Sequence, residues 1–184
     1  MEPMTLRIFQ GQVADQCELL VVEANRAQQA LNEIGAHQNW PQCMDDFWRA
    51  NQNLLAAAAN IAKALWGSGG KKGLERAKLR ESVQVDDTSI LKTSPILRNH
   101  FEHFDERIDE WETKSARHLF VDRNIGDSTK MVSPQPAEVE IFRNYDPATF
   151  QLTFWGDSIN LRDLVAEANR IAPIARARAS QWTP

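Results

Sequence analysis

The stretch "LRNHFEHFDERIDEW", from Leu97 to Trp111, indicates an amphipathic helix. At 100° per residue, one narrow arc gathers its large apolar side chains. These are Leu97, Phe101, Phe104, Ile108 and Trp111. Ser94 suits the N-cap and Pro95 the first helical position, so we expect one continuous helix from Pro95 to about Glu112. The apolar arc should be buried, and every other position of the helix is polar or charged.

Periodic apolar residues predict three more helices, at about 16–34, at about 41–66 and from about 161 onward. Asp15 is the expected N-cap of the first, and Pro173 should kink or end the last. Between the second and third helices, "GSGGKKG" (67–73) is expected to be a flexible connector. Its glycine spacing differs from that of a P-loop, and no Ser or Thr follows its lysines.

A β-hairpin is predicted ahead of the last helix. The segments "EVEIFRNY" (138–145) and "FQLTFW" (150–155) alternate apolar and polar residues around the turn "DPAT". A further short strand is expected at "RHLFVD" (117–122). The expected fold is therefore mainly α: a single domain over 1–184, built as a bundle of about four helices with a β-hairpin or small antiparallel sheet inserted at about 138–156.

The composition is that of a soluble globular protein, with 42% hydrophobic and 25% charged residues among 184. The net charge of −4 does not favour nucleic-acid binding by the surface as a whole. Cys17 and Cys43 fall on apolar helix stripes and are expected to be reduced core residues. With no predicted signal peptide and no apolar run that could span a bilayer, we expect a cytoplasmic protein without membrane contact.

The sequence "RNHFEH", Arg98 to His103, resembles the signature of the HEPN superfamily. That signature is an Arg, usually followed by a polar residue, with a His after four to six positions at the start of a helix. Many members of this superfamily are metal-independent ribonucleases, often toxins of toxin–antitoxin or defence systems, whereas others have lost activity. The resemblance implies a HEPN-like helical bundle for this chain.

The resemblance also implies roles for three residues. His103 would transfer protons, because imidazole titrates near neutral pH. Arg98 would hold the scissile phosphate and stabilise its developing charge, and Asn99 would orient His103. Arg98 and His103 lie about 140° apart around a helix. In the family that this motif resembles, two protomers pair and their motifs form one composite cleft, so the resemblance implies a homodimer with such a site.

A basic cluster follows the glycine-rich segment: Lys71, Lys72, Arg76, Lys78 and Arg80. It is either a solvated helix face or a patch that contacts the phosphates of RNA. A metal site that uses His100, His103 and Glu106 is a further alternative, but the helix lacks the paired Glu-x-x-His pattern of bundle metal sites. We expect neither a metal nor a cofactor.

Two functions follow from these patterns. The first is a HEPN-like metal-independent endoribonuclease that acts as a homodimer, in a toxin or defence role with an antitoxin-like protein as a partner. The second is a non-catalytic HEPN-like module that binds a protein or a nucleic acid. The intact Arg98–Asn99–His103 motif favours the first, and the carboxylates around His103 favour the second.

Overall fold

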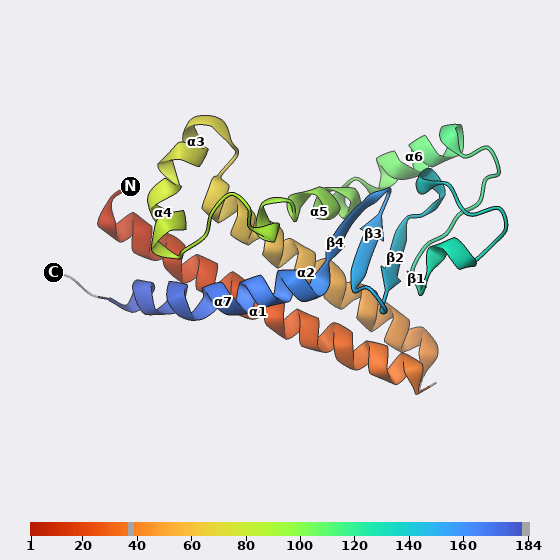
Figure 1. Cartoon of the computed structure of the whole chain (residues 1–184), viewed down its shortest axis with the longest axis horizontal. Coiled ribbons are helices and arrows are strands. Elements are labelled where there is room, and N and C mark those ends of the chain that lie inside the picture. Colours follow the sequence, from red (N-terminus) through yellow and green to blue (C-terminus); the bar gives the residue numbers. More distant parts are fainter. Residues whose placement is uncertain (37–38, 182–184) are drawn as a thin grey trace. The chain divides into compact units, whose positions relative to one another are not determined.

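The computed structural model describes residues 1–36 and 39–181 (Figure 1). The chain divides into two compact units. Unit 1 comprises Met1–Pro95 and the chain from Asp163, and unit 2 comprises Ile96–Arg162. The single domain expected over 1–184 stays a prediction. No helix in the described part of the chain is long and apolar enough to cross a membrane.

Two long helices form the centre of unit 1. Helix α1 (Pro3–Gly35) and helix α2 (Trp40–Trp66) run side by side along most of their length (Figure 1). Their buried faces carry many small residues, which let the two backbones approach closely. The buried alanines are Ala14, Ala27 and Ala30 of α1, and Ala50, Ala57, Ala58, Ala59 and Ala62 of α2. Cys17 and Cys43 are buried as expected.

Three shorter elements and the last helix complete unit 1. They are α3 (Gly70–Glu75), α4 (Ala77–Ser82), the 3-10 turn η1 (Ile90–Lys92) and α7 (Leu161–Ser180). The guanidinium of Arg80 donates to the carbonyl oxygens of Leu65 and Gly73, at 2.8 and 2.9 Å, and so joins α4 to the end of α2. Helix α7 is fastened to α1 by Arg176, which binds Asp15 at 2.7 Å and Glu18 at 2.8 Å.

Several expectations for unit 1 are wrong in detail. Helix α1 begins at Pro3, so Asp15 lies inside it as a partner of Arg176 and is no N-cap. The glycine-rich segment does not remain a connector, because its second half forms the first turn of α3. Helix α7 continues past Pro173. Pro173 and Asn169 are both exposed, so water can replace the hydrogen bond that proline removes.

Unit 2 begins with two helices where one was expected. Helix α5 (Pro95–Glu102) and helix α6 (Phe104–Lys114) are separated at His103, whose backbone angles are φ −103° and ψ 39°. With α3 and α4, this break gives seven α-helices in the described residues, compared with the expected bundle of about four. Mainly helical character is confirmed.

The sheet of unit 2 has the strand order β1 (Asn124–Ile125), β2 (Arg143–Asp146), β3 (Gln151–Phe154) and β4 (Asp157–Asn160). The predicted hairpin is confirmed as the antiparallel pair β2–β3, but its first strand begins at Arg143, and a 3-10 turn over Glu138–Glu140 replaces the expected start of the strand. Strand β4 pairs antiparallel with β3. Strand β1 pairs parallel with β2, so the sheet is mixed, where a β-hairpin or a small antiparallel sheet was expected. The segment 126–142 supplies the long crossover that a parallel pair requires. It contains the 3-10 turns η2 (Ser128–Lys130) and η3 (Glu138–Glu140).

Aromatic side chains form the core of unit 2. Phe142 and Phe154 are fully buried, and the ring of Phe104 lies 5.3 Å from the first and 5.8 Å from the second, between centroids. The predicted apolar arc is only partly correct, because Ile108 is 40% exposed. Phe101, Phe104 and Trp111 are half-buried, and Leu97 is buried. The break at His103 changes the helical phase, so α5 and α6 do not present one continuous stripe.

A buried carboxylate joins the end of α6 to η3. Glu140 accepts hydrogen bonds from Ser115 Oγ at 2.8 Å, from Arg117 Nη2 at 2.6 Å and from the Ala137 N–H at 2.8 Å. The Arg117 hydrogen bond is the largest of the causes that lower the pKa of Glu140 from 4.5 to about 2. The charged form of this side chain therefore stabilises the folded unit.

We expect Phe142→Ala to lower the free energy of unfolding by about 3–5 kcal/mol, because it removes a fully buried ring. Phe104→Ala should cost less, because its ring is half-buried, and Ile108→Ala should cost under about 1 kcal/mol. Urea denaturation followed by tryptophan fluorescence measures all three. Equal losses for Phe142→Ala and Ile108→Ala would contradict this core.

Glu140→Gln should destabilise unit 2 in a pH-dependent way. A depressed folded-state pKa contributes stability that is fully present above the unfolded pKa and lost as pH falls through the folded pKa. The difference in unfolding free energy between wild type and variant should therefore be largest above pH 4.5 and shrink as the pH falls toward about 2. Denaturation curves at several pH values test this, and a pH-independent difference would refute it.

Candidate functional site

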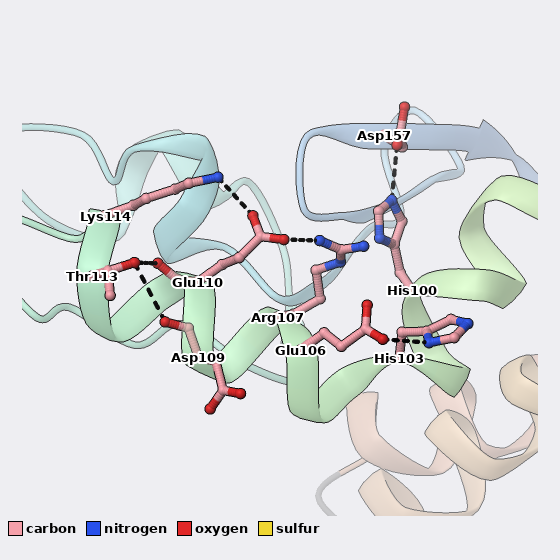
Figure 2. Close-up of polar contacts among 9 residues, drawn as sticks. All are labelled: His100, His103, Glu106, Arg107, Asp109, Glu110, Thr113, Lys114 and Asp157. Atoms are coloured by element: carbon pink, nitrogen blue, oxygen red, sulfur yellow. Dashed lines mark hydrogen bonds and ion pairs between the residues drawn. The ribbon is translucent and has the colours of Figure 1, made fainter.

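His103 lies at the break between α5 and α6. Its side chain is exposed, and its Nδ1 lies 3.1 Å from Glu106 Oε1 (Figure 2). His103 is also the residue that precedes the first turn of α6, and no side chain caps that helix. The imidazole is thus held by a carboxylate one turn ahead, at the positive end of a helix dipole.

Arg98 lies on α5, where it forms an ion pair with Glu102. Both side chains of this pair are substantially exposed, so the pair stabilises the fold by little, and an incoming phosphate could displace the carboxylate. In the described residues no contact joins Arg98 to His103. The structure of one chain therefore does not bring these two motif residues together.

Asn99 is exposed on α5. Its carbonyl oxygen accepts a hydrogen bond from the His103 N–H at 2.9 Å, which continues the helical pattern up to the break. The side chain that contacts the imidazole is that of Glu106, and no contact to the Asn99 amide is found in the described part of the chain. Glu106 is therefore the residue that orients His103 here.

The other histidine of the motif, His100, was considered from the sequence only as a metal ligand, and it makes more contacts than His103. His100 is 9% exposed, its Nε2 lies 2.8 Å from Asp157 Oδ2, and its ring centroid lies 5.4 Å from that of Phe154 (Figure 2). The helical pattern held a signal for this burial. At 100° per residue, His100 is only about 20° from Trp111, at the edge of the apolar arc.

A second polar network follows along α6. Glu110 binds Arg107 and, at 2.7 Å, Lys114 Nζ (Figure 2). These cations, with the Lys114 hydrogen bond as the largest cause, lower the pKa of Glu110. The guanidinium of Arg107 also lies 5.9 Å from the Trp155 ring. The negative charge of Glu110 is therefore compensated locally, which reduces the repulsion that an anion near this helix would meet.

The residues of the basic cluster at 71–80 have different surroundings in the structure. Arg76 lies over the Phe9 ring at 3.7 Å, and Arg80 binds backbone carbonyl oxygens, so both have structural contacts. Lys71 and Lys72 are exposed on α3. Lys78 is exposed on α4, where it lines a pocket with residues of α1 and α7.

The histidines and carboxylates of unit 2 are distributed in pairs. His100 contacts Asp157, and His103 contacts Glu106. Among the described residues, no group of three or more His, Cys, Asp or Glu side chains is arranged to hold a metal ion. The alternative site of His100, His103 and Glu106 therefore does not form a ligand set in this structure.

Comparing the chain with models of protein families, with curated proteins and with solved structures gave no match.

Proposed function

We propose that the chain is a HEPN-like, metal-independent endoribonuclease that acts as a homodimer. The observation that carries the proposal is the state of His103 at the α5–α6 break. One ring nitrogen is held by Glu106, and the second, Nε2, has no contact in the described part of the chain (Figure 2). An exposed imidazole oriented by a carboxylate is the arrangement that proton transfer to or from a substrate requires.

The chemistry uses the substrate's own nucleophile. Neutral His103 takes the proton of a ribose 2′-hydroxyl, whose oxygen then attacks the adjacent phosphorus. The bond from phosphorus to the 5′-oxygen breaks, and that oxygen receives a proton from a second imidazole. The products are a 2′,3′-cyclic phosphate and a 5′-hydroxyl. Arg98 binds the phosphate oxygens and stabilises the charge that develops on them.

The homodimer supplies what one chain lacks. In the described residues no contact joins Arg98 to His103, and one chain provides a single exposed imidazole in the motif. Two copies that approach on the polar sides of α5 and α6 would place the Arg98 of one beside the His103 of the other. They would also provide one imidazole as base and one as acid.

The alternative is a non-catalytic module that binds a protein or nucleic-acid partner. It is favoured by one observation: Arg98 and His103 each already have a carboxylate partner within one helical turn. Such local pairs are also what a solvated helix surface carries without any chemistry. Cleavage assays separate the two functions.

Single-stranded RNA should be cut in the presence of a chelator, with 2′,3′-cyclic phosphate ends on the products. His103→Ala should abolish cleavage, and Arg98→Ala should lower kcat by about 10²-fold or more, the size of effect seen when one charge-stabilising donor is lost. Gel electrophoresis and end-group analysis of the products measure both. Unchanged cleavage by His103→Ala would refute the assignment.

Two further variants sharpen this test. His118→Asn is the matched control, because His118 is exposed and its φ of 47° suits asparagine. It should retain activity. Glu102→Gln should raise kcat/KM several-fold, because it releases Arg98 from its ion pair. His100→Ala is unsuitable as a control, because His100 is buried against Phe154.

Sedimentation equilibrium should give twice the mass of the chain at micromolar concentration. Because the proposed interface is polar and charged, raising the salt concentration should weaken the dimer. Arg98→Glu should also weaken it, by placing like charges together in the composite cleft. A monomer at all concentrations up to about 100 μM would contradict a composite site, since such a dimer would be weaker than ordinary specific complexes.

A further inference from the structure

Three cations from three helices line one pocket of unit 1. The pocket has a volume of about 540 Å³, and its cations are Arg7 of α1, Lys78 of α4 and Arg178 of α7. Of the described residues that line it, Glu81 carries the opposing negative charge. Three positive charges against one negative charge leave the pocket net positive, although the whole chain carries a net charge of −4.

In the part of the chain that the structure describes, no carboxylate forms an ion pair with the cations of this pocket. Arg7 contacts the Gln181 carbonyl oxygen at 3.5 Å, and Arg178 contacts the Gln181 side-chain oxygen at 3.4 Å, which are long and weak hydrogen bonds. No ion pair to a carboxylate is found for either, or for Lys78, in the described part of the chain. Arg176, two residues before Arg178 on the same helix, is by contrast bound by Asp15 and Glu18.

The pocket has a buried polar wall that holds α1 and α4 together. Gln10 is 4% exposed and donates from Nε2 to Ser82 Oγ at 2.9 Å. Ser82 Oγ in turn donates to the Leu79 carbonyl oxygen at 2.8 Å. Gln10 and Ser82 both line the pocket, so its shape is fixed by packed and hydrogen-bonded residues and not by surface side chains alone.

We propose that this pocket binds a phosphate group of a nucleotide-sized ligand. Guanidinium groups match phosphate oxygens bidentately, and a lysine adds a compact charge. The pocket falls within the range of small-molecule sites, roughly 300–1,000 Å³, so the phosphate would belong to a larger molecule. That molecule is a free nucleotide or a short segment of RNA backbone. The proposal does not rest on the ribonuclease, because it concerns other residues.

The pocket also explains which part of the basic cluster would contact phosphate. Lys78 lines it, whereas Lys71 and Lys72 do not. Lys71→Gln and Lys78→Gln therefore make the same charge change on neighbouring helices of the same unit, one outside the pocket and one inside. Binding that follows overall charge alone would respond equally to both substitutions.

The test is calorimetric titration of the full chain with ADP and, separately, with a 2′-O-methyl RNA pentanucleotide. The methylated RNA has no 2′-hydroxyl, so binding is measured without cleavage. Lys78→Gln and Arg178→Gln should each weaken binding about tenfold, and Lys71→Gln less than about twofold. Glu81→Gln should tighten binding several-fold, because it removes the negative charge of the pocket.

Binding of both ligands supports a site for phosphate in general, and binding of the RNA alone supports a site for the RNA backbone. Failure of both ligands to bind at low salt overturns the proposal. Equal weakening by Lys71→Gln and Lys78→Gln also overturns it. Thermal unfolding of each variant checks the fold, which should be unchanged because the substituted side chains are exposed. These binding measurements do not depend on cleavage. Absence of ribonuclease activity and absence of ligand binding in the pocket are therefore distinguishable results.

Discussion

The close packing of α1 against α2 determines what else unit 1 can hold. Small residues on the buried faces let the two helices pack along most of their length, and α4 contacts both of them. Arg80 then joins α4 to the end of α2, and Arg176 joins α7 to α1. These attachments bring three helices to one pocket, where Arg7 and Arg178 remain without carboxylate partners in the described chain.

In unit 2, irregular backbone positions the candidate side chains, whereas unit 1 is built mainly from regular helices. The break at His103 exposes one imidazole at a helix start. The turn at Trp155 and Gly156, where both residues have positive φ, joins β3 to β4 and places Asp157 against His100. Both turn residues adopt the angles that two-residue hairpin loops require. The candidate chemistry therefore lies where hydrogen-bonding patterns are interrupted, which is where polar groups need side-chain or solvent partners.

The sequence predicted the elements with strong local signals and missed those that depend on distant partners. Helix α2 was located to within one residue at each end, and the hairpin of β2 and β3 was found from alternation and the turn around Pro147. Strand β1 has only two residues and is defined by its parallel partner, which no local pattern shows. The break at His103 was also missed, because the apolar period continues across it and neither glycine nor proline marks it.

His100 and His103 show what a sequence motif leaves open about the surroundings of its residues. They are three positions apart in one motif; the resemblance assigned His103 to the site, whereas His100 entered only the alternative of a metal site. The two imidazoles lie in different environments on either side of the break. His100 packs on Phe154 with Asp157 at its Nε2. His103 is exposed, with Glu106 at its Nδ1. A buried imidazole held by a strand residue can stabilise the fold but cannot reach a polymer substrate. An exposed imidazole beside a carboxylate can exchange protons with a ligand, which is why the proposed role falls to His103 and not to His100.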